Sequence, residues 1–148
     1  MTDPLFHQDD AATPLTPEER EGLIPSYITL RRELNEAEQA NILEAEAWAL
    51  ARKPDILDEK SLKTLHKRMF GRVWRWAGEF RRTERSIGVA PHHIGVDLRN
   101  VLADCRYWIE HGTYPPDEIA ARFHHRLVQI HPFPNGNGRH ARLALIFC

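Results

Sequence analysis

Cysteine is scarce in this sequence, with only Cys105 and Cys148 among 148 residues. Two cysteines cannot form the disulfide framework that stabilises small secreted domains. An apolar run long enough to span a bilayer is also missing, and the acidic, polar N-terminus is not that of a signal peptide. These absences predict a cytoplasmic protein without a membrane partner.

An excess of charge of one sign is missing as well. The formal net charge is −1, although 28% of the residues are charged. A balanced charge gives no general attraction to phosphate backbones, so we expect no nucleic-acid partner. With 42% hydrophobic residues, the chain is expected to build one domain around one core.

Helical apolar spacing dominates what is present and predicts an all-α bundle. Residues 1–28, rich in Pro, Asp and Glu, are predicted to form an extended N-terminal arm, and residues 29–148 to form the domain. A first helix is predicted over 33–52, and a second begins after Asp58, its N-cap. A third is predicted over 97–111, with a Gly112 cap, and a fourth over 116–130. The third helix is expected to turn inward Leu98, Val101, Leu102, Cys105, Trp108 and Ile109.

Residues 78–96, here called the flap, interrupt this helical pattern. Three glycines and Pro91 separate two short β-compatible pieces, 80–83 and 87–90, which predict an irregular β-hairpin. Arg81, Arg82 and Arg85 form a cluster that either attracts ATP or an acidic target, or lies on a solvated surface.

A second break, here called the motif, runs from His131 to Arg142. Its prolines restrict the backbone, while Gly136 and Gly138 permit tight turns and close approach. A glycine turn that opens into a helix presents backbone N–H groups to an anion. Arg139 and Arg142 share one face of that helix and suit phosphate oxygens, so the motif predicts a polyphosphate site.

His131 stands at the entrance to this site, where an imidazole can accept a proton near neutral pH. A base beside a held phosphoryl donor is the minimum for transferring a phosphorus centre to a hydroxyl. The sequence has no Gly-Lys-Ser/Thr, which excludes a P-loop ATPase.

The motif resembles the signature of the Fic family, His-Pro-Phe-x-Asp/Glu-Gly-Asn-Gly-Arg-x-x-Arg, at every position except 135. Residues 76–81 are similar to the family's Trp-Ala-Gly-x-x-Arg element, and the resemblance covers the chain from Ile56 onward. Residues 21–25 and 33–42 resemble a bacterial subgroup called mobile mystery protein B. The resemblance implies the Fic fold, an all-α bundle with a short β-hairpin flap.

It further implies an enzyme that moves AMP from ATP to a Ser, Thr or Tyr hydroxyl of a target protein. His131 would be the base, Phe133 would anchor the motif in the core, and Arg139 and Arg142 would neutralise the β- and γ-phosphates. The implied nucleotide-binding residues are Asn135, Gly136, Asn137, Gly138, Arg139 and Arg142. The implied target-binding flap residues are Ile87, Gly88, Val89, His92 and His93, which would pair with an extended target segment.

Asn135 departs from the family, which has Asp or Glu there as a ligand to Mg²⁺. An Asn carbonyl oxygen can still coordinate Mg²⁺, but without the negative charge. Many Fic proteins are restrained by a helix with Ser/Thr-x-x-x-Glu-Gly/Asn, whose Glu pairs with the second motif arginine. Glu33 is the candidate here, paired with Arg142; Glu21 or a separate antitoxin-like or regulatory partner is the alternative.

Two other functions stay open. One is transfer of phosphate, as in the Doc branch, or of another nucleotide, although Gly138 differs from the Doc-like Asp-Ala-Asn-Lys-Arg. The other is a weakly active or inactive nucleotide-binding module, which Asn135 favours. The apolar helical pattern continues to Cys148 without a stop signal, so we expect the domain to extend further.

Overall fold

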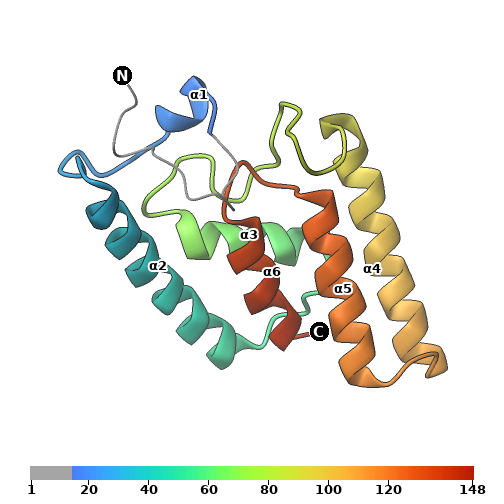
Figure 1. Cartoon of the computed structure of the whole chain (residues 1–148). Coiled ribbons are helices and arrows are strands. Elements are labelled where there is room, and N and C mark those ends of the chain that lie inside the picture. The colour runs from blue at the N-terminus through green and yellow to red at the C-terminus, as the bar shows by residue number, and fades with distance from the viewer. Residues whose placement is uncertain (1–14) are drawn as a thin grey trace.

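A computed structural model of the chain describes residues 15–148 and shows a bundle of helices (Figure 1). Helix α2 packs on α3, α4 packs on α5, and α6 packs on both α5 and α3. The all-α prediction is confirmed. The elements are α1 (Pro17–Arg20), α2 (Arg31–Arg52), α3 (Glu59–Phe70), the 3₁₀ helix η2 (Pro91–His93), α4 (Ile94–His111), α5 (Pro116–Ile130) and α6 (Asn137–Ile146).

The helix boundaries follow from capping residues in the sequence. The Asp58 side chain accepts a hydrogen bond from the Ser61 N–H at 3.2 Å and caps α3, as predicted. Gly112 ends α4 in the left-handed conformation, with φ 60°, and Pro116 is the first residue of α5. Helix α4 begins three residues earlier than predicted because η2 leads into it and Ile94 is fully buried.

The residues that α4 and α5 bury largely match those predicted from the apolar spacing of the sequence. Every apolar residue predicted for the core face of α5 is buried. On α4, however, Ile109 is 52% exposed, so its predicted inward position is wrong. Trp108, the other inward position predicted at this end, is partly buried against the core, and its ring packs edge-on against Tyr114 of the turn that follows. The buried residues of α4 are Ile94, Leu98, Val101, Leu102 and Cys105.

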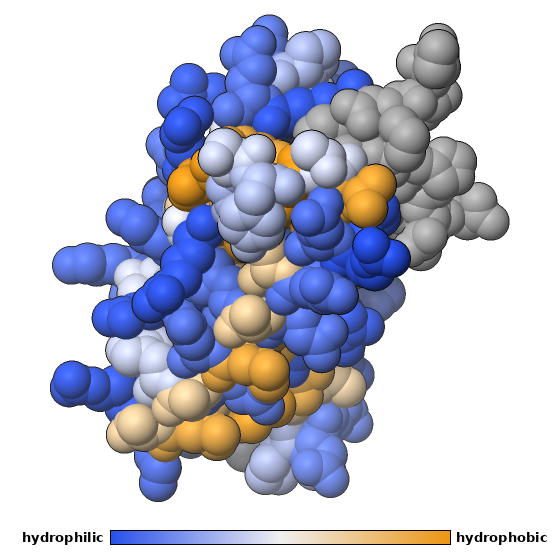
Figure 2. Space-filling view, turned by 90° about the vertical axis from the view of Figure 1, so that its left-hand side faces the viewer, coloured by the Kyte–Doolittle hydropathy of each residue, from blue (hydrophilic) through white to orange (hydrophobic). Residues whose placement is uncertain are grey.

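Helix α2 buries two polar side chains, one of them a carboxylate. Glu38 and Asn41 are buried there among Leu34, Ala45 and Ala49. Asn41 donates to the Arg68 carbonyl at 2.8 Å and accepts from the Arg72 N–H at 3.0 Å, which ties α2 to the end of α3. The side of the molecule that carries α2 is mostly hydrophilic, with an apolar patch in the lower part of the view (Figure 2). Leu43 and Leu50 of α2 and Ile146 of α6 are exposed.

The flap is irregular, and residues 79–90 contain no strand. The predicted hairpin ladder is therefore not formed. The Arg81 guanidinium takes its place by donating to the Thr83 carbonyl at 2.9 Å and to the Val89 carbonyl, one on each arm. The arms bond to the end of α5 instead, through Arg81 N–H to Pro132 at 2.9 Å and Val89 N–H to Ile130 at 3.3 Å.

The N-terminal segment was expected to be an extended arm, and residues 1–14 lie outside the described part. From Leu15 onward the chain instead forms helix α1 and then runs along residues 73–76, where Leu23 and Trp74 form an antiparallel bridge. In Figure 1, α1 lies at the same end of the molecule as the flap and the turn from α5 to α6. Among the helices of residues 15–148, none has the length and apolarity to cross a membrane.

Candidate active site

The motif begins with a tight turn between α5 and α6. His131 ends α5 in the left-handed conformation, with φ 53°, which is uncommon for a residue other than glycine. Two residues later, Phe133 is completely buried and its ring stacks on His66, with centroids 3.8 Å apart. The core thus fixes the turn just beyond His131.

Asn137 locks this turn from the other side. Its side-chain oxygen accepts from the Phe133 N–H at 2.9 Å, and its amide donates to the Phe133 carbonyl at 2.8 Å. The side chain is therefore occupied within the motif. Any contact of Asn137 with a nucleotide would have to use its backbone N–H, in the first turn of α6.

The two motif glycines have different environments. Gly136 has φ 78°, and a Cβ atom there would lie about 2.5 Å from the Phe70 ring, so only glycine fits. Gly138 is exposed, with open space where a Cβ would project. The first turn of α6 is therefore accessible, and free N–H groups in such a turn attract anions.

His66 supports the motif, and the sequence analysis did not identify it. The Gly78 N–H donates to its Nδ1 at 2.9 Å, so Nε2 carries the proton and donates to the Asn135 carbonyl at 3.0 Å. Burial lowers the pKa of His66 well below 6.5. Its place among Leu62, Leu65 and Met69 on the apolar face of α3 was the available signal.

The Arg81 side chain connects the flap to the backbone at His131. Its Nε donates to the His131 carbonyl at 2.5 Å, and its Nη2 donates to the Ile130 carbonyl at 3.1 Å. Arg81 is 2% exposed, whereas Arg82 lies on the surface. The predicted solvated surface therefore holds for Arg82, while Arg81 and the Arg85 side chain, which is 5% exposed, are structural.

His131 itself is a neutral base in this environment. Burial, together with the positive charges of Arg81 and Arg85, lowers the pKa of His131 to about 4. Its Nε2 atom is buried and has no hydrogen-bond partner among the described residues. A neutral imidazole with an unused ring nitrogen can accept a proton from a substrate hydroxyl.

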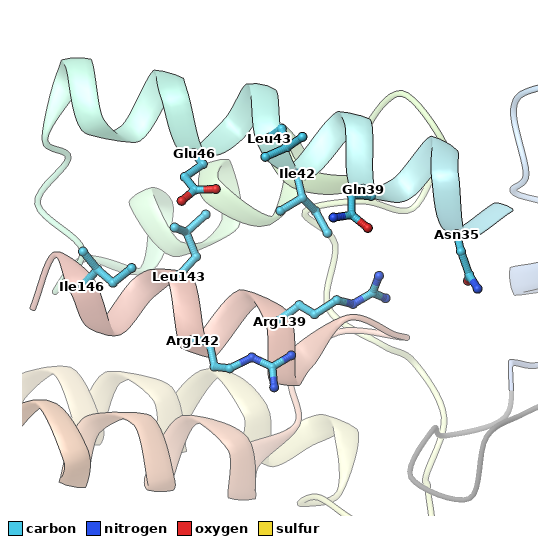
Figure 3. A pocket seen from close by; sticks show the side chains of 9 residues that line it. All are labelled: Asn35, Gln39, Ile42, Leu43, Glu46, Arg139, Arg142, Leu143 and Ile146. Atoms are coloured by element: carbon cyan, nitrogen blue, oxygen red, sulfur yellow. The ribbon is translucent and has the colours of Figure 1, made fainter. Parts of the chain in front are cut away.

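Arg139 and Arg142 line a groove of about 570 Å³ between α6 and α2 (Figure 3). Both guanidinium groups extend toward the N-terminal end of α6. Arg142 is exposed, while Arg139 lies over the Phe70 ring, 4.8 Å from its centroid. The other lining residues are Asn35, Gln39, Ile42, Leu43, Glu46, Leu143 and Ile146.

The carboxylate that reaches the motif is not the predicted one. Glu33 accepts from Thr29 N–H at 3.1 Å and Leu30 N–H at 3.0 Å, which caps the start of α2, and no ion pair joins it to Arg142. The expected pairing is therefore wrong. One turn further along α2, Glu38 accepts from Arg139 Nη1 at 3.2 Å and from Trp74 Nε1 at 2.9 Å.

Asn135 lies at the mouth of the turn, half-buried. Its side-chain oxygen is 3.4 Å from Nη2 of Arg139, whose side chain lines the groove. No group of three or more His, Cys, Asp or Glu side chains within residues 15–148 could hold a metal by itself. A metal at Asn135 would therefore take most of its ligands from phosphates and water.

The structure brings only part of the predicted target-binding flap to His131. A Cβ on Gly88 would lie 2.7 Å from the His131 Cβ, and Val89 bonds to Ile130. Ile87 is 51% exposed at the tip of the flap. The rings of His92 and His93 contact each other in η2 in a tilted arrangement, with centroids 4.3 Å apart.

Comparison with known proteins gives consistent matches. A model of the Fic/DOC family matches residues 56–148. The protein adenylyltransferase Fic of Drosophila melanogaster is 38% identical over 101 residues, which cover 66% of this chain and 20% of the relative. The chain thus spans about a fifth of the length of the curated relatives it matches.

Solved structures share the fold. The N-terminal Fic domain of a Bep effector protein from Bartonella quintana superposes with a TM-score of 0.68 at 20% identity, covering 96% of this chain and 71% of that one. BepC from Bartonella tribocorum, solved with bound AMPPNP, has a TM-score of 0.64 at 20% identity, with coverage of 88% and 77%. At these identities the likeness establishes the fold alone.

The buried histidines predict a loss of stability in acid. Burial also lowers the pKa of His140 to about 4, and its Nε2 donates to the Leu62 carbonyl. Below pH 6.5 the unfolded chain binds protons that folded His66, His131 and His140 do not, so the free energy of unfolding should fall as pH drops from 6.5 to 4. Each histidine contributes a slope of at most about 1.4 kcal/mol per pH unit.

Urea unfolding between pH 7.5 and 4.5 would measure this slope. His140→Gln should flatten it, because glutamine retains a donor for Leu62 but does not titrate. His125→Gln, at an exposed position of α5, is the matched control and should leave the slope unchanged. An identical slope in His140→Gln and the parent would contradict the assignment.

Proposed function

This chain belongs to the Fic/DOC family, and we propose that it transfers AMP from ATP to a Ser, Thr or Tyr hydroxyl of a target protein. We propose that the enzyme is cytoplasmic, which the scarcity of cysteine supports. We also propose that it is bacterial, which the resemblance of residues 21–25 and 33–42 to mobile mystery protein B supports. Its curated relatives are named protein adenylyltransferases.

One arrangement carries the proposal: a neutral His131, whose Nε2 has no hydrogen-bond partner within residues 15–148, shortly before the N-terminus of an arginine-bearing helix. The first turn of α6, including Gly136 and Gly138, would bind phosphate oxygens through backbone N–H groups. Arg139 and Arg142 would neutralise the phosphates beyond the reacting one. The groove toward α2 would hold the rest of the nucleotide.

In the proposed reaction, the target hydroxyl oxygen bonds to the α-phosphorus and its proton passes to His131. The bond from the α-phosphorus to the oxygen that bridges the β-phosphate breaks, and pyrophosphate leaves. Because the pKa of His131 is lowered to about 4, the base is already unprotonated at neutral pH. The flap beside Gly88 would align an extended target segment by backbone pairing, as in strand addition.

Removing the base gives the first test of this function. His131→Ala should lower transfer by about 10²–10⁴-fold while ATP still binds, because the arginines and α6 remain. His131→Asn is the companion variant, since asparagine tolerates the left-handed conformation at this position. Transfer within a few-fold of the parent by both variants would remove His131 from the base role.

The transferred group is identified by labelling ATP at the α- or the γ-phosphate. In lysate, AMP transfer places only the α-label on protein. A γ-label on protein would indicate phosphate transfer instead. Binding of ATP without either label reaching protein would indicate a nucleotide-binding module.

We further propose that Asn135 would contribute one neutral oxygen ligand to a Mg²⁺ ion held together with the nucleotide phosphates. The position of its side-chain oxygen beside the Arg139 guanidinium, which lines the groove, supports this assignment. When bound, such an ion neutralises phosphate charge and favours departure of pyrophosphate. The single uncharged ligand implies weak binding of the metal.

Restoring a carboxylate tests the metal assignment. Asn135→Asp should lower the Mg²⁺ concentration for half-maximal transfer several-fold, because hard cations prefer charged oxygen ligands. Titration of Mg²⁺ at fixed ATP measures this directly. Superimposable titrations for Asn135→Asp and the parent would mean that residue 135 does not contact the metal.

Glu38 is proposed to compete with the nucleotide for Arg139. The Glu38 side chain is 8% exposed and its partner arginine 35%, so the arginine can exchange this carboxylate for a phosphate oxygen. A bound carboxylate also repels a triphosphate. Because Trp74 Nε1 holds the other Glu38 oxygen, the carboxylate stays in place.

Glu38→Gln should therefore tighten ATP binding. Glutamine keeps an acceptor for Trp74 but loses the charge on Arg139. Since Arg139 is partly exposed, the ion pair contributes at most about 1 kcal/mol, or roughly fivefold in Kd. Calorimetric titration of ATP measures the change, and Glu33→Gln is the control, expected to leave Kd unaltered. Equal affinities for Glu38→Gln and the parent would exclude competition.

A further inference from the structure

The segment that precedes the matched family region is firmly attached to the domain. The Ile24 N–H donates to the Val73 carbonyl at 2.8 Å, and the Arg75 N–H donates to the Gly22 carbonyl at 2.8 Å. Trp76 Nε1 donates to the Glu19 carbonyl at 2.9 Å, directly at the end of α1. Helix α1 therefore has a fixed position next to the base of the flap.

From this position α1 directs one carboxylate at the flap. Both Glu19 carboxylate oxygens accept from Arg85 Nη2. One of them also accepts from the Thr16 N–H at 2.9 Å, which closes a capping box and fixes the side chain. The Glu19 and Arg85 side chains are 12% and 5% exposed, so this ion pair is nearly buried.

Arg85 is the one inward-facing residue of the flap tip, defined as residues 82–88. The other six residues of the tip are exposed. The Arg85 guanidinium also donates to Thr83 Oγ1 of the same tip, and its buried Nε has no hydrogen-bond partner within residues 15–148. The Glu19 carboxylate is thus the polar group that ties the tip to another element of the described chain.

The position of this tip matters because its last residue, Gly88, lies against His131. Gly88 is at the point of closest approach, where even a Cβ would collide with His131. Arg81 fixes the two arms of the flap at its base, and the Glu19–Arg85 ion pair fixes the tip. A buried ion pair adds little net stability over an apolar contact, but it selects one arrangement of the charged groups.

We propose that Glu19 is a positioning residue that holds the target-facing flap over His131 through its ion pair with Arg85. A segment outside residues 56–148 then takes part in recognition of the target protein. This inference rests on the proposed transfer to a protein hydroxyl. Arg139 and Arg142 lie on α6 facing α2, so the ion pair should affect the protein substrate and leave nucleotide binding unchanged.

Hydrogen–deuterium exchange tests the structural part without requiring activity. Glu19→Gln should raise exchange of the flap-tip amides about tenfold, the scale of one lost charge-assisted bond. Glu18→Gln, on the exposed side of the same helix, is the matched control and should not change it. The charge-swapped double variant Glu19→Arg/Arg85→Glu should restore part of the protection. Unchanged exchange in Glu19→Gln would overturn the proposal.

Transfer kinetics test the positioning part. With α-labelled ATP and increasing lysate protein, Glu19→Gln should need several-fold more lysate for half-maximal labelling, with the same Kd for ATP. Faster flap exchange with an unchanged lysate dependence would also overturn the proposal. If the parent protein labels nothing, the proposed AMP transfer fails, and the exchange experiment still decides whether Glu19 holds the flap.

Discussion

The buried guanidinium of Arg81 is the contact on which the geometry of the site depends. It donates to the His131 carbonyl and shares the Ile130 carbonyl with the Val89 N–H, so it satisfies backbone acceptors where α5 stops. A cation at this end also matches the negative pole of the helix. The same group joins both arms of the flap and lowers the pKa of His131, so one side chain fixes helix end, flap and base together.

Neutral histidines in the interior order the motif, whereas arginines at the edge of the groove carry the positive charge. His66 stacks on Phe133 and bonds Asn135 and Gly78 while remaining uncharged, so it orders the motif without adding charge beneath the proposed phosphate site. His140 anchors α6 to α3 in the same way. The positive charge for a nucleotide is then concentrated on Arg139 and Arg142, where the groove opens.

The helices and the motif could be predicted because both are local: apolar spacing, caps such as Asp58 and Gly112, and residues 131–142 lie within short windows. Side-chain partners distant in sequence could not. Glu33 has the spacing of a restraining glutamate, but its carboxylate accepts hydrogen bonds from the backbone N–H groups of Thr29 and Leu30. Arg81 and Arg85 resembled a solvated cluster because their carbonyl and carboxylate partners lie tens of residues away.

Two carboxylates that precede the matched family region, Glu19 of α1 and Glu38 of α2, each pair with an arginine near the site. Their surroundings suit them to different tasks. Glu38 meets an arginine that is one-third exposed and faces the groove, so water or phosphate can replace the carboxylate at small cost. Glu19 meets an arginine whose side chain is almost fully enclosed, and separating that pair would leave a charge buried. The first pair can therefore exchange with a ligand, whereas the second can only hold its element in place.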